Sequence, residues 1–233
     1  MEYFYEKWFG KIASPFWNYE SIDRYLNDKD SILNHCYKTL RFGKELEDEF
    51  TDGVVRSINQ VVDVIPNLMI VYLISQIEEM FRELFTEIFL KKPQLLNKCI
   101  KFFNEEAELK LKFSLNELIK FNSKEEYMLV LAQRGAELCI SGSFEKVIKR
   151  LEEIPKATDF KICFDKKDVD VLVNFQNKRN EIVHENKHEK INILDITEED
   201  ENGEIKLHAI ANILCKITEI LFQLGFNVYV PSK

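Results

Sequence analysis

The chain has 233 residues, of which 45% are apolar and 31% are charged, and its net charge is −8 at pH 7. These proportions exclude long disorder, and the acidic balance excludes a protein that coats nucleic acid through excess lysine and arginine. Only 7 glycines and 5 prolines are present. Because sandwiches and barrels need more turn residues than this, the composition favours an all-α fold.

The N-terminal region is rich in aromatic residues, since eleven of the 28 Phe, Tyr and Trp residues lie in the first 42 positions. Such a cluster favours an N-terminal helical layer packed on the body of the protein, and an exposed aromatic docking surface is the alternative. We therefore divide the chain into an aromatic-rich helical extension, residues 1–60, and a helical domain, residues 61–233.

Targeting features point to the cytoplasm. The first residues lack the basic and apolar segments of a secretory signal. The longest uncharged run, Val64 to Ile77, is shorter than the ~20 residues that span a bilayer. The 5 cysteines are scattered without a CxxC pair. We expect reduced thiols, no membrane partner and no cofactor.

The strongest helical pattern covers residues 67–90, where apolar side chains recur with a period of 3.6 residues. We expect Pro66 to separate this helix from a shorter one at 54–65. Two lysines followed by Pro93 are expected to end it, because cations favour a helix C-terminus and proline does not continue a helix.

Glu78 is an unusual residue within this pattern. It lies on the apolar arc of the predicted helix, whereas Glu79 lies on the polar face. A buried carboxylate without a partner costs free energy. We therefore predict that Glu78 pairs with Arg179 or another site residue, and an exposed Glu78 at the edge of the apolar stripe is the alternative.

Further elements follow from local signals. Two S-x-x-E patterns predict capping boxes, and Ser-Gly-Ser at 141–143 predicts a break before a helix at 144–153. Asp168 is a candidate N-cap for the next helix. Residues 191–196 and 204–208 are consistent with one short β-hairpin before a last helix. The capping boxes are expected at Ser114–Glu117 and Ser123–Glu126.

The residues most suggestive of chemistry are Arg179, Asn180, Val183 and His184, which form an R-N-x-x-V-H pattern one helix before the C-terminus. This pattern resembles the HEPN superfamily, whose signature is Arg and His separated by four to six residues, often with Asn directly after Arg. The order of helices over 61–233 is also similar to a HEPN helical bundle.

The resemblance implies a metal-independent endoribonuclease that works as a homodimer, with the motifs of both subunits meeting at one cleft. Proteins with this motif usually serve as toxins or antiviral effectors. The implied partners are therefore RNA, a second copy of the chain, and an antitoxin or defence protein.

The residue types fit cleavage of RNA without metal. Histidine exchanges protons near neutral pH, so His184 can serve the ribose 2′-OH. Arg179 can hold a phosphate in a bidentate manner, and Asn180 can orient the His ring or a phosphate oxygen. On a regular helix Arg179 and His184 lie about 140° apart, so a kink or a second copy must bring them together.

Two other interpretations of this segment stay open. His184-Glu185-Asn186-Lys187-His188 matches the HExxH zinc pattern, with His184 and His188 as ligands. Alternatively, Arg179 is a structural cation in a non-catalytic dimeric interaction module.

The basic run at Lys146, Lys149, Arg150 and Lys156 fits an RNA path or a solvated helix face. The acidic stretch at 198–204 is most simply an exposed loop.

Overall fold

The computed structural model describes residues 2–26, 28, 47–154, 162–185 and 191–229, and in this part of the chain all regular structure is helical. The all-α prediction is thus confirmed. The helices are α1 (Phe4–Leu26), α3 (Glu47–Lys91), the 3₁₀ helix η2 (Pro93–Leu95), α4 (Leu96–Ile100), α5 (Glu105–Leu109), α6 (Leu115–Leu118), α7 (Lys124–Ile140), α8 (Phe144–Glu153), α9 (Lys166–Glu185), α10 (Leu194–Thr197) and α11 (Lys206–Gln223).

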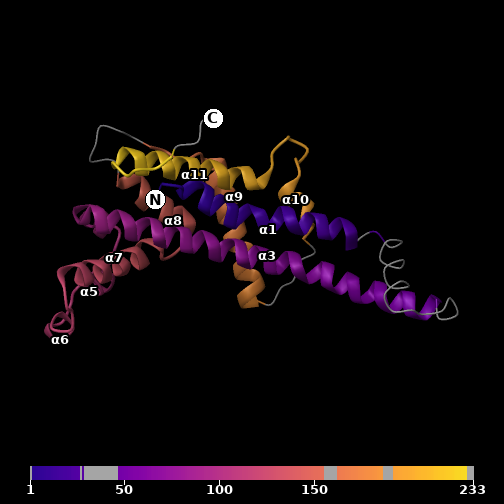
Figure 1. Cartoon of the computed structure of the whole chain (residues 1–233), viewed down its shortest axis with the longest axis horizontal. Coiled ribbons are helices and arrows are strands. Elements are labelled where there is room, and N and C mark those ends of the chain that lie inside the picture. The colour runs from indigo at the N-terminus through magenta and orange to yellow at the C-terminus, as the bar shows by residue number, and fades with distance from the viewer. Residues whose placement is uncertain (1, 27, 29–46, 155–161, 186–190, 230–233) are drawn as a thin grey trace.

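Helix α3 is the long axis around which the other elements pack (Figure 1). It contacts α1, α7 and α9, and most of its apolar side chains from Ile70 onward are buried, whereas Tyr72 is exposed. The predicted helix at 67–90 and its end before Pro93 are confirmed.

The expected break at Pro66 is wrong, because α3 continues through it for 45 residues in all. Proline lacks an N–H and costs a helix interior about 3 kcal/mol. Burial of Ile70, Leu73 and Ile74 just beyond Pro66 stabilises the helix against that cost. The helix also crosses residues 60 and 61, so the division into 1–60 and 61–233 falls inside a helix and not in a linker.

Helix α1 is the predicted aromatic layer. Phe4, Trp8 and Phe16 are buried, and α1 packs on α3 and α11. The Tyr229 N–H donates to the Glu2 carbonyl at 2.9 Å and so joins the two ends of the described chain. The expectation of a packed N-terminal layer is confirmed for these residues, whereas Tyr37 and Phe42 lie outside the described residues.

Local capping signals are mostly confirmed. Ser114 and Glu117 form both bonds of a capping box. Ser123 caps α7 by accepting from the Glu126 N–H at 3.1 Å, but the Glu126 carboxylate accepts from the N–H of Asn122 instead of Ser123. The Ser-Gly-Ser break before α8 is present, and Gly142 at its centre has a φ of 96° that favours glycine.

The predicted hairpin at 191–196 and 204–208 is wrong. Residues 194–197 form helix α10, and α11 begins at Lys206. The alternation of Ile191 and Ile193 suggested a strand, but the buried side chains are Ile193, Ile196 and Thr197, which have helical spacing.

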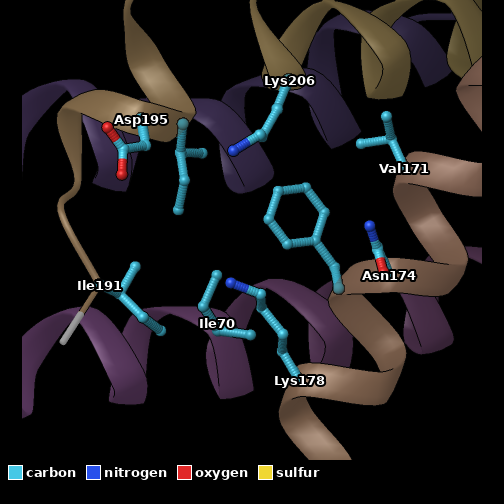
Figure 2. A pocket seen from close by; sticks show the side chains of 9 residues that line it. Ile70, Val171, Asn174, Lys178, Ile191, Asp195 and Lys206 are labelled. Carbon is cyan, nitrogen blue, oxygen red and sulfur yellow. The ribbon is translucent and has the colours of Figure 1, made fainter. Parts of the chain in front are cut away.

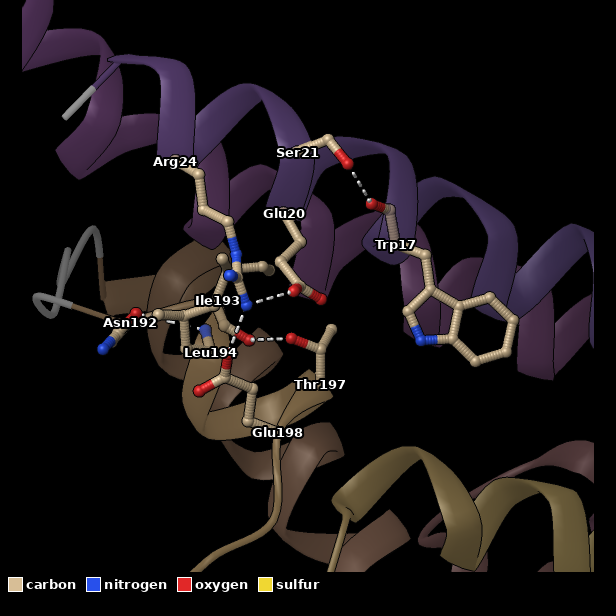
Figure 3. A network of polar contacts seen from close by, with 9 residues as sticks. All are labelled: Trp17, Glu20, Ser21, Arg24, Asn192, Ile193, Leu194, Thr197 and Glu198. Carbon is tan, nitrogen blue, oxygen red and sulfur yellow. Dashed lines mark hydrogen bonds and ion pairs between the residues drawn. The ribbon is translucent and has the colours of Figure 1, made fainter. Parts of the chain in front are cut away.

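Helix α10 is fixed to α1 by Arg24. This residue donates to Glu20 on its own helix at 2.9 Å and to Glu198 after α10 at 2.5 Å, as Figure 3 shows. The acidic stretch that follows is an exposed turn, as expected. In it Asp200 accepts from the N–H groups of Asn202 and Glu204.

Two further expectations concern the thiols and the membrane. The four described cysteines are free, with Cys99 and Cys139 buried, and burial beside Cys99 raises the pKa of the Cys139 thiol. One helix of the described part, Val64–Lys91, is long and apolar enough to cross a membrane by length and composition, and 50% of that window is buried inside the protein.

Candidate functional site

The candidate site is built on α9, and its N-terminus begins earlier than expected. The helix starts at Lys166, and the Asp165 Oδ1 accepts from the Lys167 N–H at 2.8 Å, so the predicted N-cap at Asp168 is wrong by one turn. Asp168 lies half-buried within the helix and accepts from Asn212 of α11 at 3.3 Å. Burial raises the pKa of its carboxyl.

Gln176 anchors the middle of α9 to the turn between α7 and α8. Its Oε1 accepts from the Phe144 N–H at 2.9 Å, and its Nε2 donates to the Gly142 carbonyl at 3.2 Å. Gln176 is itself buried. Sequence reasoning missed this residue. The signal was present, because a glutamine one position after Phe175 on the apolar arc needs partners for the same reason as Glu78 does.

Arg179 lies near the centre of the buried face of α9, which also carries Leu172, Phe175 and Ile182. Its Nη2 donates to Glu78 Oε1 on α3, and the Arg179 side chain keeps 20% of its surface exposed against 32% for Glu78. The predicted pairing of Glu78 with Arg179 is therefore confirmed.

Asn180 completes a small polar group around Arg179. The Arg179 Nη1 donates to the Asn180 Oδ1 at 3.1 Å. Two of the guanidinium nitrogens thus bind side-chain oxygens, one from a carboxylate and one from an amide. Carboxylate and phosphate oxygens make equivalent bonds to a guanidinium group, so Glu78 occupies a position that an anionic group of a ligand can also fill.

His184 stands apart from this group. It lies in the last turn of α9 and is exposed, about 140° around the helix from Arg179. It shares a face with Asn180, which is also exposed. One chain therefore brings Arg179, Asn180 and Glu78 together and leaves His184 on the outer face. Helix α9 runs without a break from Lys166 to Glu185.

Only part of the HExxH zinc pattern lies among the described residues. His184 and Glu185 lie at the end of α9, whereas His188 lies outside the described residues. Among the described residues no group of three or more His, Cys, Asp or Glu side chains is arranged to hold a metal ion. The HExxH interpretation stays a prediction.

The basic run on α8 divides into two kinds of residue. Lys149 pairs with Glu145 at 2.7 Å on the exposed face, as expected for a solvated helix surface. Arg150 is buried and donates to the carbonyls of Cys139 and Ser141 at the end of α7. The fourth residue, Lys156, lies outside the described part of the chain.

In comparisons with known proteins, no protein-family model, curated protein or solved structure matches the chain.

Proposed function

We propose that the chain is a metal-independent endoribonuclease of the HEPN type, active as a homodimer. The observation that carries the proposal is the contact of Arg179 with both Glu78 and Asn180, at the start of an R-N-x-x-V-H segment whose His184 is exposed. A partly exposed guanidinium with a carboxylate partner can exchange that carboxylate for a phosphate of RNA.

The chemistry follows from the residue types. The ribose 2′ oxygen attacks the adjacent phosphorus, and His184 of one copy takes the 2′-OH proton. The bond from phosphorus to the 5′ oxygen breaks, and His184 of the second copy protonates the departing oxygen. The products are a 2′,3′-cyclic phosphate and a free 5′-OH end. Arg179 stabilises the negative charge that gathers on the phosphate oxygens in the transition state.

A second copy is needed because Arg179 and His184 of one chain lie on different faces of α9. Val183, beside His184, is a large apolar side chain that is 50% exposed. An exposed valine next to the exposed His184 and Asn180 is consistent with a face of α9 that a second α9 covers.

In the cell, we expect this activity to act as a toxin or antiviral effector under the control of an antitoxin or defence partner. Expression of the chain should then arrest growth, and His184→Ala should relieve the arrest while the protein still accumulates. Arrest that persists with His184→Ala would contradict this role.

A second candidate function is a non-catalytic dimeric helical interaction module. The observation in its favour is that the Arg179–Glu78 ion pair joins α9 to α3. This is a structural role, and it requires no substrate. In that case Arg179 and His184 have no shared chemistry.

The deciding experiment is cleavage of RNA by the full chain in EDTA. His184→Ala and Arg179→Ala should each lower the rate by roughly 10²–10⁴-fold. The matched controls are His208→Ala, an exposed histidine on α11, and Arg82→Ala, a half-buried arginine paired with Glu79 and Glu137, and both should retain activity.

The possible outcomes separate the candidates. Full activity in both His184→Ala and Arg179→Ala would reject the nuclease assignment at these residues. A folded wild-type dimer that cleaves no RNA would favour the interaction module. About one zinc ion per purified chain, lost in His184→Ala, would instead favour the zinc interpretation.

A further inference from the structure

A cavity and a pair of buried thiols lie outside the proposed site. The cavity, about 200 Å³ in volume, lies between α3, α9, α10 and α11 (Figure 2). Its ammonium groups, Lys178 and Lys206, share the lining with the Asp195 carboxylate, so neither sign of charge stands alone there. The thiols of Cys99 and Cys139, in contrast, can react with each other.

The contact between α4 and α7 brings these two thiols together. Gly135 of α7 lies so close to α4 that a Cβ at this residue would stand 2.7 Å from the Leu96 Cδ1. Cys139 lies four residues after Gly135, on the same face of α7. Cys99 lies three residues after Leu96, on the same face of α4. The Cys99 and Cys139 thiols are hydrogen-bond partners, and both residues are fully buried.

The surroundings of Cys139 determine how readily its thiol reacts. Burial, and then the hydrogen bond with Cys99, raise the pKa of this thiol, whereas the charge of Arg150 opposes the shift. The thiol stays protonated while α4 is closed on α7, and a protonated, buried thiol reacts slowly with oxidants. Helix α4 has only 5 residues, and local opening of such a short element costs less free energy than unfolding of the whole chain. An oxidant therefore reaches the pair when α4 opens.

We propose that Cys99 and Cys139 form a modification site, at which hydrogen peroxide converts the two thiols to a disulfide. One sulfur attacks the peroxide, the O–O bond breaks, and a sulfenic acid and one water form. The second sulfur then attacks the sulfenic sulfur, the S–S bond forms, and the hydroxyl group leaves as a second water. The two thiols together lose two electrons and two protons, and the peroxide is the species that is reduced.

The disulfide ties α4 to the end of α7 that supports α9. The Cys139 carbonyl accepts from Arg150 at 2.8 Å, and Gln176 of α9 binds the turn that follows α7. The bond also closes a ring over residues 99–139, which contains α5 and α6. Because such a ring restricts the unfolded chain, oxidation should raise the melting temperature by at least about 5 °C.

The test treats the folded, fully reduced chain with excess hydrogen peroxide near neutral pH and maps the cysteine peptides by mass spectrometry. We expect a cross-linked pair of peptides that joins Cys99 to Cys139 and weighs two hydrogen atoms less than the separate peptides. Dithiothreitol should restore both thiols and the original melting temperature. The peptide map uses the wild-type chain, so its outcome does not depend on whether a variant folds.

Variants identify the cysteines that react. Cys99→Ala and Cys139→Ala should each abolish the cross-link and the rise in melting temperature, because a disulfide needs both sulfurs. Cys163→Ala, which removes an exposed thiol before α9, is the matched control and should keep both effects. His184→Ala should keep them too, whether or not the chain cleaves RNA, because the site uses no residue of the proposed ribonuclease.

Three results would overturn the proposal. One is a peptide map in which Cys99 and Cys139 stay reduced, or gain only oxygen atoms, after the exposed Cys163 has been oxidised. Another is a cross-link that survives in Cys99→Ala, which would assign the reaction to other cysteines. The third is a disulfide that leaves the melting temperature unchanged or lowers it, because the bond would then not hold α4 on α7.

Discussion

Helices α8 and α9 each carry one arginine that turns toward the rest of the protein, and the two arginines bind different acceptors. Arg150 of α8 is 7% exposed and donates to two backbone carbonyls, at 2.8 Å to Cys139 and at 2.7 Å to Ser141. Arg179 of α9 has a side chain that is 20% exposed and binds the Glu78 carboxylate and the Asn180 amide.

This difference separates a structural arginine from a candidate functional one. Carbonyls at the end of a helix lack helical N–H partners, and Arg150 satisfies two of them, the buried Cys139 carbonyl and the part-buried Ser141 carbonyl. Burial lowers the pKa of Arg150, because its charged form is desolvated. Arg179 instead binds a side chain of the chemical class that a phosphate can replace, and it retains contact with solvent.

The largest expected effect is the loss of Arg150. Arg150→Met should lower the free energy of unfolding by about 3 kcal/mol, because the buried Cys139 carbonyl and the part-buried Ser141 carbonyl lose a charged donor. For a chain of this length the melting temperature should fall by roughly 6–12 °C. Thermal and urea denaturation measure both quantities.

The neighbouring Lys149→Met is the control, since Lys149 makes only an exposed pair with Glu145, and it should change stability by less than about 0.5 kcal/mol. If Arg150→Met and Lys149→Met lower the free energy of unfolding by equally small amounts, Arg150 does not stabilise the end of α7.

The next effect concerns Gln176, which fixes α9 to the same turn that Arg150 supports. Gln176→Leu keeps the side-chain volume but leaves the Phe144 N–H and the Gly142 carbonyl without their partner. We expect a loss of about 2 kcal/mol in the free energy of unfolding, measured by urea denaturation. Asn177→Leu, the exposed neighbour, should stay within about 0.5 kcal/mol of the wild type. A loss as large as that of Gln176→Leu would contradict the anchoring role.

Periodicity predicted the parts of this arrangement that depend on one helix. It placed Glu78 on the buried arc of α3 and so led to its pairing with Arg179. It also predicted the last helix, whereas the end of α3 was predicted from two lysines and Pro93. These predictions succeed because the face on which a side chain lies follows directly from its position in a helix.

Features that depend on several elements were not predictable in this way. The packing around α3 overrides the local effect of Pro66. Arg150 and Lys149 belong to one basic run in the sequence, and only the position of the end of α7 distinguishes the structural role of Arg150 from that of Lys149. The cavity beside Lys178 and Lys206 arises where four helices meet, so no local pattern indicates it. The assembly of Arg179 with a second His184 depends on a second chain and stays a prediction.

A smaller effect is expected for the Arg179–Glu78 pair. Both side chains keep contact with solvent, so Arg179→Met and Glu78→Gln should each cost about 1 kcal/mol or less. A double-mutant cycle by urea denaturation should give a coupling of about 0.5–1 kcal/mol. A loss of 3 kcal/mol or more, equal to that of Arg150→Met, would place Arg179 among the structural arginines and favour the interaction module.

The smallest effect extends the comparison to a third arginine, Arg134 of α7. It donates to Glu117 at 2.5 Å, and Glu117 also accepts from the Ser114 N–H at 2.9 Å. The bond from the Ser114 backbone, then Arg134 and the Ser114 hydroxyl, lower the pKa of Glu117 to about 2. The unfolded chain, with the ordinary pKa of 4.5, binds this proton at higher pH than the folded chain does.

The stabilising contribution of the Glu117 carboxylate is therefore complete above about pH 4.5 and is lost as the pH falls toward 2. Wild type should exceed Glu117→Gln in urea midpoint at pH 6, and the difference should shrink between pH 4.5 and pH 2. Glu105→Gln, an exposed acid at the start of α5, is the control. A difference that stays constant with pH would mean that Arg134 binds a glutamine as well as a carboxylate. Charge would then add nothing to this surface pair, in contrast to the charge-dependent role proposed for Arg179.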